Sequence, residues 1–295
     1  MLAARRKLRE SGVPMTDGDL RILARQPILF AADGGEAVHA PLILTSVAGV
    51  EARFILDTGS EVHLLTTEHT DRAGLDLAPG EEGTDHSGAV VPSWSVEDVT
   101  MQVGGEAVVL HSVVAIPAPA PFPGWGIGGI VSPQHLHPTA TAVIDLVQDE
   151  LLLVQGDDDA VAALLASRRP DATILTLERV PEFSSVVVCA AVRGYPEVPT
   201  ILNTGGRNTE FARVAVPGLV HAVPEAIGAG VSGADVLGAT AGAQALVVAG
   251  HTVPVASLAV RESVPDPPGL VGMDVLRGTV LACTADLERH VLWQI

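Results

Sequence analysis

One stretch of the chain joins an apolar run to a single carboxylate. Residues 54–56 are apolar and are followed at once by Asp57, Thr58 and Gly59. Three consecutive apolar residues are typical of a strand that is buried on both faces. A carboxylate at the end of such a strand is costly unless hydrogen bonds hold it, and Gly59 lets a second backbone approach closely. The residues fit a reactive carboxylate held in place, and they also fit an ordinary turn at the end of a strand.

The pattern occurs twice. Residues 199–206 repeat it 146 residues later, with Asn203 in place of the carboxylate and with Thr204 and Gly205 behind it. Because an internal repeat must be interpreted before anything else, we searched for further pairs near this offset. Four more occur in the same order, at offsets of 145 to 141 residues: 87–89 with 232–234, 103–112 with 248–257, 126–129 with 269–272, and 144–146 with 285–287. The preserved order predicts one duplicated unit.

At these residues the chain resembles the aspartic peptidases of the retropepsin and pepsin kind. Their signature is an apolar pair followed by Asp-Thr-Gly-Ser/Ala, and later in the same lobe two apolar residues and a glycine. The matching stretches are 55–60 and 127–129 in the first half, and 201–206 and 270–272 in the second. The resemblance covers about residues 40 to 295. It implies an all-β fold of two tandem retropepsin-like β-barrel lobes, related by pseudo-twofold symmetry and carrying short helices.

The repeat and the resemblance divide the chain into four segments. We expect an N-terminal arm (1–37), lobe 1 with the Asp-Thr-Gly turn and a flap (38–155), a linker with a short helix (156–175), and lobe 2 with the Asn-Thr-Gly turn and its own flap (176–295). The first flap is expected at 84–96. Within the arm, helix is predicted at 2–10 and again at 20–23.

The resemblance also implies roles for the residues of both turns. In that family two carboxylates face each other, share one proton and activate a water that attacks a peptide carbonyl. Two threonines lock each turn to the opposite lobe, and flaps close over a peptide held as an extra strand. The catalytic positions here are Asp57, Asn203, Thr58, Gly59, Thr204 and Gly205. The substrate-binding positions are Ser60, Gly206, Ser87, Gly88, Ala89, Ser232, Gly233 and Ala234.

Asn203 departs from the family pattern. A carboxamide has the shape of a neutral carboxylic acid but can neither give up nor accept the shuttled proton. Paired acid–base catalysis, typically worth about 10²–10⁴-fold in rate, is therefore incomplete. Without a like charge beside it, Asp57 is expected to titrate like an ordinary aspartate. We predict an aspartic-peptidase-like protein that is inactive or severely impaired as a peptidase.

Three explanations of Asn203 stay open. In the first, Asn203 was introduced into an active enzyme to trap a complex. In the second, Asn203 is natural and the protein is a peptide-binding pseudopeptidase. In the third, the cleft has been recruited for other chemistry in which Asp57 is the sole acid or base. His63 and His86 are candidate helpers in that third case, although a core-edge position and a flap-surface position also explain them.

Composition limits the partners. A formal net charge of −18 argues against nucleic acid. The sequence has no run of 18 apolar residues, so we expect no membrane span. The basic N-terminus lacks the apolar segment of a secretory signal. With Cys189 and Cys283 interpreted as buried free thiols, we expect a cytoplasmic protein. We expect no cofactor and no metal, because His135 and His137 have no third ligand nearby. The expected partner is a peptide or protein, and a monomer suffices to form the cleft.

Overall fold

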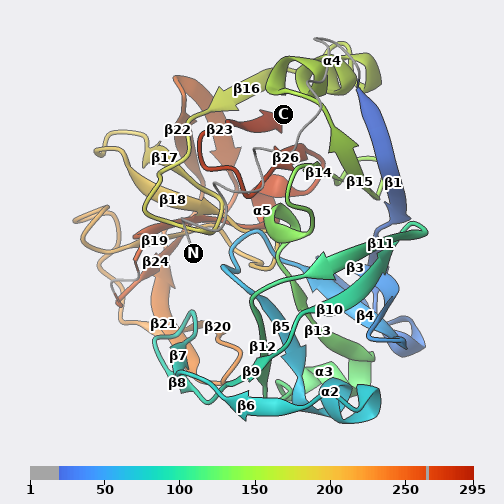
Figure 1. Cartoon of the computed structure of the whole chain (residues 1–295). Helices are drawn as coiled ribbons and strands as arrows, with labels where there is room; N and C mark the ends of the chain where they lie inside the picture. Colours follow the sequence, from blue (N-terminus) through green and yellow to red (C-terminus); the bar gives the residue numbers. More distant parts are fainter. Residues whose placement is uncertain (1–19, 264–265) are drawn as a thin grey trace.

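The computed structural model describes residues 20–263 and 266–295. Strands dominate this part of the chain, with a few short helices between them, and they form three large sheets and one small hairpin (Figure 1). Two of the large sheets come from different halves of the sequence, and the third is shared by both. This confirms the all-β class with barrel-like lobes that the sequence predicts.

The lobe 1 sheet is built from the first half of the chain. Its strand order is β11 (Glu106–Leu110), β10 (Val99–Val103), β3 (Ala37–Val47), β4 (Val50–Leu56), β13 (Ile127–Val131), β5 (His63–Thr66), β12 (Val113–Ile116), β9 (Trp94–Val96) and β6 (Leu77–Pro79), with β2 (Leu29–Ala31) beside β3. A separate small hairpin joins β7 (Gly83–Thr84) to β8 (Val90–Val91).

The lobe 2 sheet repeats this plan in the second half of the chain. Its strand order is β20 (Glu225–Ala229), β21 (Asp235–Thr240), β24 (Ala259–Arg261), β19 (Glu210–Ala212), β25 (Gly269–Val271), β18 (Val198–Leu202), β17 (Val187–Val192), β22 (Gln244–Val248) and β23 (His251–Val255).

The third sheet joins the two halves. Its order is β1 (Arg21–Pro27), β15 (Glu150–Gln155), β14 (Thr141–Asp145), β26 (Val280–Cys283), β27 (Val291–Gln294) and β16 (Ile174–Leu177). The antiparallel pair β14 and β26 is the junction between the halves. We call this six-stranded layer the shared sheet.

Short helices lie between the strands. They are α2 (Thr67–Ala73), α3 (Pro121–Trp125), α4 (Asp158–Arg168) and α5 (Met273–Leu276), with single 3₁₀ turns at η2 (Asp33–Gly35) and η3 (Pro133–His135). The helix expected in the linker is α4. Its first turn is capped by the Asp157 carboxylate, which accepts the N–H of Ala160 at 2.8 Å.

Backbone hydrogen bonds show which residues of the two lobes are equivalent. The N–H of Asp57 donates to the carbonyl of Val131, and the N–H of Asn203 donates to the carbonyl of Val271, both at 2.9 Å. The segment equivalent to 269–272 is therefore 129–132. The alignment of 126–129 with 269–272 is wrong by three residues. The sequence alignment matched Gly129 to Gly272, the glycine that ends the motif in lobe 2. In the structure, the residue equivalent to Gly272 is Ser132.

One core supports both turns. Leu56 and Leu202, which precede Asp57 and Asn203, are fully buried and belong to the same hydrophobic cluster. That cluster also takes in residues of the shared sheet, such as Trp293. Burying each such side chain stabilises the fold by about 1.5–3 kcal/mol, so the two turns are anchored to one packed interior.

Two smaller predictions are wrong. Residues 21–27 form β1, antiparallel to β15, instead of the helix predicted at 20–23. Sheet pairing that buries Ala24 outweighs the weak helix preference of a short segment. Cys189 is an exposed free thiol, since β17 turns it outward, and only Cys283 is buried. The helix predicted at 2–10 lies outside the described residues. Across 20–263 and 266–295, the structure contains no helix of the length and apolarity needed to cross a membrane.

Candidate active site

The turns that follow β4 and β18 meet between the lobes. A Cβ atom placed on Gly59 would lie 2.8 Å from Cγ of Asn203, and one placed on Gly205 would overlap the carboxylate of Asp57. Each glycine is therefore covered by the side chain of the opposite turn, and no larger residue fits. The structure brings Asp57 and Asn203 together as the repeat suggests.

The two threonines tie the turns to each other. The Thr58 N–H donates to the Thr204 hydroxyl at 3.1 Å, and the Thr204 N–H donates to the Thr58 hydroxyl at 3.0 Å. The Thr204 hydroxyl donates in turn to the carbonyl of Leu56 at 2.7 Å, and the Thr58 hydroxyl to that of Leu202. Both threonines are fully buried. Every bond crosses the lobe boundary, which fixes the spacing of the two turns.

Asp57 and Asn203 are held by matching bonds. Oδ1 of Asp57 accepts the N–H of Gly59 at 2.8 Å, and Oδ1 of Asn203 accepts the N–H of Gly205 at 2.8 Å. Asn203 Oδ1 also accepts the N–H of Gly206 at 2.9 Å. These donors fix which end of the carboxamide is oxygen. The remaining side-chain atoms are Oδ2 of Asp57, which accepts protons, and Nδ2 of Asn203, which only donates hydrogen bonds.

Asp57 does not titrate like an ordinary aspartate. Burial raises the pKa of its carboxyl group, and this outweighs the backbone N–H groups of Gly59 and Gly205 and the charge of His86, all of which lower the pKa. The expectation of an unshifted group is therefore wrong. That expectation took account only of the missing like charge of a second aspartate. Desolvation by itself disfavours the ionised carboxylate and so raises the pKa of Asp57.

Ser60 and Gly206 play different parts in their turns. The Ser60 hydroxyl donates to the carbonyl of Val62 at 2.7 Å, so it holds its own turn in place. Gly206 contributes its backbone N–H to Asn203, and its carbonyl accepts the N–H of Met273 at 2.8 Å. Ser60 is positioned by the turn that carries Asp57, and Gly206 is positioned by the turn that carries Asn203.

Two buried residues missed by sequence analysis support the lobe 1 turn. The Ser132 hydroxyl and the Gln134 amide both donate to the carbonyl of Ser60, at 2.8 and 3.0 Å. Each is at most 1% exposed. Ser132 is the counterpart of Gly272, so the correct alignment of the repeat was the signal that could have found it. No repeat partner pointed to Gln134.

The predicted flap residues lie at the tips of two equivalent hairpin turns. In flap 1 (84–96) the Gly88 N–H donates to the carbonyl of Asp85 at 2.9 Å; in flap 2 (225–240) the Gly233 N–H donates to that of Gly230 at 3.0 Å. The glycines have nearly the same positive φ, 85° and 83°. The tips touch, since the Asp85 carboxylate accepts the N–H of Ser232 at 2.8 Å. The hairpins lie side by side at one edge of the molecule (Figure 1).

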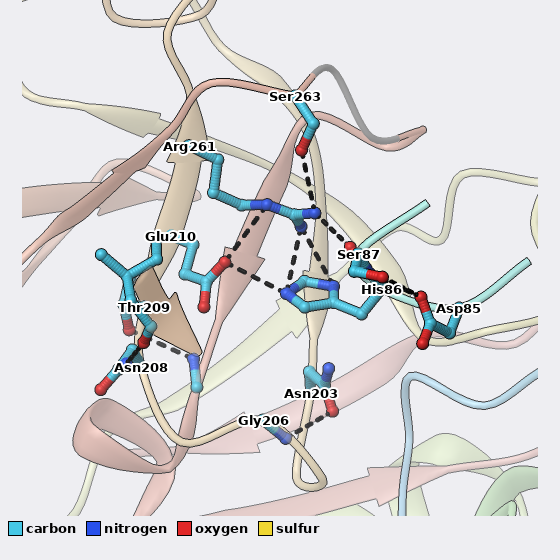
Figure 2. A network of polar contacts seen from close by, with 12 residues as sticks. Asp85, His86, Ser87, Asn203, Gly206, Asn208, Thr209, Glu210, Arg261 and Ser263 are labelled. Atoms are coloured by element: carbon cyan, nitrogen blue, oxygen red, sulfur yellow. Dashed lines mark hydrogen bonds and ion pairs between the residues drawn. The ribbon is translucent and has the colours of Figure 1, made fainter. Parts of the chain in front are cut away.

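The tip of flap 1 also reaches a buried ion pair of lobe 2. Nε2 of His86 lies 3.1 Å from Oε2 of Glu210, and Nη1 of Arg261 lies 3.0 Å from Nδ1 of His86 (Figure 2). Nη2 of Arg261 donates to the backbone carbonyl of His86. Burial lowers the pKa of the Arg261 guanidinium, although the charge of Glu210 opposes this. His86 is therefore fixed within the site and is not simply a flap-surface residue.

The second candidate helper, His63, is part of the lobe 1 interior. Its side chain is fully buried, and Nδ1 accepts the N–H of Ser132 at 3.3 Å. Burial lowers its pKa to about 4. His63 therefore supports the Asp57 turn through Ser132, whose hydroxyl binds the carbonyl of Ser60. Within 20–263 and 266–295 there is also no group of three His, Cys, Asp or Glu side chains arranged to hold a metal ion.

Comparison with known families agrees with this geometry. Residues 44–134, the greater part of lobe 1, match a family model described as aspartyl protease. A search of curated proteins finds no match. The matched segment contains the Asp57 turn, flap 1 and the strand β13 that holds Asp57 in place. Within lobe 1, the chain is thus similar to the aspartyl protease family.

Proposed function

We propose that the chain binds an extended peptide or protein segment in the cleft between its lobes, above Asp57 and Asn203, and that it is inactive or severely impaired as a peptidase. The observation that carries this proposal is the contact of the two turns, each glycine being covered by the other turn's side chain. The scaffold of a two-carboxylate site is complete, and one carboxylate is missing from it.

The proton balance explains the predicted loss of activity. Hydrolysis needs one group to take a proton from the attacking water and a second to donate to the peptide carbonyl. Asp57 supplies one carboxyl group. Nδ2 of Asn203 can donate a hydrogen bond to a carbonyl, but it cannot release a proton or take one up. All proton transfers therefore fall to Asp57.

The flaps support an extended ligand. Two hairpins with equivalent turns meet at their tips through Asp85 and Ser232. A strand-like peptide beneath them would use main-chain hydrogen bonds for affinity and side-chain pockets for specificity. Since one chain supplies both turns and both flaps, a monomer suffices in this proposal. The free thiols of Cys189 and Cys283 support a cytoplasmic location.

A second candidate function is acid or base chemistry by Asp57 alone on a small molecule. The raised pKa of the half-buried Asp57 carboxyl favours this alternative, because catalytic acids are commonly carboxyl groups with raised pKa values. In this case the proposed cleft would serve another substrate.

The reversion Asn203→Asp tests the main proposal. It should give cleavage of an unfolded, carboxymethylated protein at mildly acidic pH, blocked by a statine-type inhibitor. The double variant Asp57→Asn/Asn203→Asp is the matched control, since it retains one carboxyl group and should stay inactive. A reverted protein that still binds peptides and cleaves none would identify a binding module. Loss of small-molecule turnover in Asp57→Asn, with peptide binding unchanged, would favour the second candidate.

A further inference from the structure

Two pairs of strands occupy equivalent positions in the two lobes and differ in chemistry: β5 and β12 in lobe 1, and β19 and β24 in lobe 2. We call each pair the wall of its lobe. In lobe 1, Leu64 of β5 pairs with Ile130 of β13. In lobe 2, Glu210 of β19 pairs with Leu270 of β25. Since Ile130 and Leu270 each precede the valine that holds the catalytic turn, Leu64 and Glu210 are counterparts.

The neighbouring parallel strand adds a second exchanged position. Leu64 pairs with Val114 of β12, and Glu210 pairs with Ala259 of β24. Two residues further along these strands stand Ile116 in lobe 1 and Arg261 in lobe 2. Lobe 2 therefore carries an acid and a base where lobe 1 carries two aliphatic residues.

The flap tips follow the same division. His86 of flap 1 and Val231 of flap 2 each come second in their turns, as the bonds of Gly88 and Gly233 show. Val231 packs against the apolar cluster of lobe 1, and so does Leu64. His86 packs against Glu210 and Arg261 of lobe 2. Each half of the cleft thus has a wall and an opposing flap tip of one kind, apolar in lobe 1 and polar in lobe 2.

The contacts of His86 show what the polar wall accepts. Glu210 is a carboxylate and can only accept, so Nε2 of His86 carries the hydrogen between them. Arg261 can only donate, and it donates to the carbonyl of His86. The side chains of Glu210 and Arg261 are 8% and 2% exposed, and they form an ion pair at 3.4 Å. In these contacts the pair binds a group that offers one donor and one acceptor side by side.

We propose that Glu210 and Arg261 determine the specificity of the lobe 2 half of the cleft, selecting a ligand side chain that both donates and accepts, the carboxamide of Asn or Gln or the imidazole of His. Such a side chain takes the place of His86 when flap 1 lifts. A lysine or an aspartate would leave an uncompensated charge in a buried, already neutral pair, which is costly. The lobe 1 half takes an aliphatic side chain, so the peptide binds in one direction. The proposal rests on the peptide-binding function above and names its ligand class.

Fluorescent octapeptides test this assignment with the full chain. Each position in turn carries Ala, Leu, Gln, Asn, His, Lys or Glu, and binding is followed by anisotropy. At one position Gln, Asn or His should bind about tenfold or more tightly than Leu or Lys, because a site built for hydrogen bonds rejects side chains that leave its polar groups unpaired. At another position Leu should be preferred.

Three variants separate a specificity pocket from a simple flap contact. Glu210→Leu/Arg261→Ile installs the lobe 1 residues and should shift the polar position to Leu, leaving the aliphatic position unchanged. Arg213→Ala/Glu262→Ala removes an exposed ion pair of the same lobe and should leave both preferences unchanged. His86→Val changes a side chain that is 34% exposed, so it does not threaten folding. It removes the competitor for the pocket and should tighten binding of Gln peptides about threefold or more.

The outcomes separate this proposal from the proposed function. Peptides that bind with no polar preference, or a double variant that weakens all peptides equally, overturn the pocket assignment and leave peptide binding standing. Unchanged affinity for Gln peptides in His86→Val also overturns it. If no octapeptide binds to the wild-type chain, the proposed function itself fails.

Discussion

Oδ1 of Asp57 and Oδ1 of Asn203 accept the N–H of Gly59 and of Gly205 at the same distance, 2.8 Å. The two turns therefore differ at the centre of the site in a single outer atom, the oxygen Oδ2 of Asp57 against the nitrogen Nδ2 of Asn203. Substitutions between acid and amide at these positions change charge and proton transfer while preserving the hydrogen bonds that hold the turn.

Asp57→Asn should stabilise the protein at neutral pH. Burial raises the pKa of Asp57 in the folded state, so the stability that its protonated form contributes is complete below the unfolded-state pKa and is lost as pH rises through the folded-state pKa. The variant should unfold at higher urea concentration than the wild type at pH 7, and the difference should shrink toward pH 3. An Asp57→Asn protein less stable than the wild type at pH 7 would contradict the raised pKa of the Asp57 carboxyl.

Thr58→Val should loosen the junction between the lobes. It removes a buried hydroxyl that accepts the N–H of Thr204 and donates to the carbonyl of Leu202. Leaving buried polar groups unpaired costs about 1–3 kcal/mol each in the free energy of unfolding. Thr58→Ser keeps the hydroxyl and is the matched control, which should lose much less. Equal losses in both variants, measured by urea denaturation, would mean that the hydroxyl bonds contribute little.

Gly205→Ala should damage the site through steric overlap. The added methyl group would collide with the carboxylate of Asp57, and overpacking of this kind typically costs about 1–3 kcal/mol. Gly228→Ala adds the same methyl group in a flap strand where nothing lies within 4 Å, so it should be tolerated. Thermal melting of both variants is the measurement. A Gly205→Ala protein as stable as Gly228→Ala would show that the turns are further apart than described.

His63 should make the protein less stable in acid. Its folded-state pKa is lowered by burial to about 4, from an ordinary value of 6.5. The unfolded chain therefore binds a proton first, and stability is lost as pH falls from about 6.5 to about 4, by about 3 kcal/mol at most. His63→Asn keeps an acceptor for the N–H of Ser132 but does not titrate. Its unfolding free energy should depend less on pH in this window, and an unchanged pH slope would refute the assignment.

Asp85→Ala should separate the flap tips. Burial alone would raise the pKa of Asp85, but hydrogen bonds from Ser232 and Ser87 lower it more. The contact therefore persists above the unfolded-state pKa and weakens as pH falls through the lower folded-state value. At pH 6 the Ser232 N–H should exchange with solvent about tenfold faster in Asp85→Ala than in the wild type. Asp235→Ala, which changes an exposed acid at the start of β21, should leave that rate unchanged.

The repeat made the fold and the centre of the site predictable. Asp57 and Asn203 could be paired because the apolar run before each turn and the Thr-Gly after it survive in both copies. The threonine bonds were expected from the resemblance to the aspartic peptidases. The alternation of residues 99–103 is typical of a strand, and in β10 Val99, Met101 and Val103 face the core while Thr100 and Gln102 face solvent.

The contacts of flap 1 with lobe 2 could not be predicted from the repeat. Glu210 and Arg261 lie 51 residues apart, and their importance depends on His86, from the other lobe. The repeat identifies what the halves have in common, whereas these residues matter because the halves differ. The raised pKa of Asp57 was missed for a related reason, since desolvation depends on packing by every neighbour and not on the one residue across the axis.

The shared sheet has a consequence for how the chain folds during synthesis. β14 is complete once residue 145 has emerged from the ribosome, but its outer edge pairs with β26, which is not made until residues 280–283. For well over a hundred residues of translation the first half carries an uncovered strand edge, the kind of surface on which newly made chains join one another. The first half is released from this hazard only after residues 280–283 have been made.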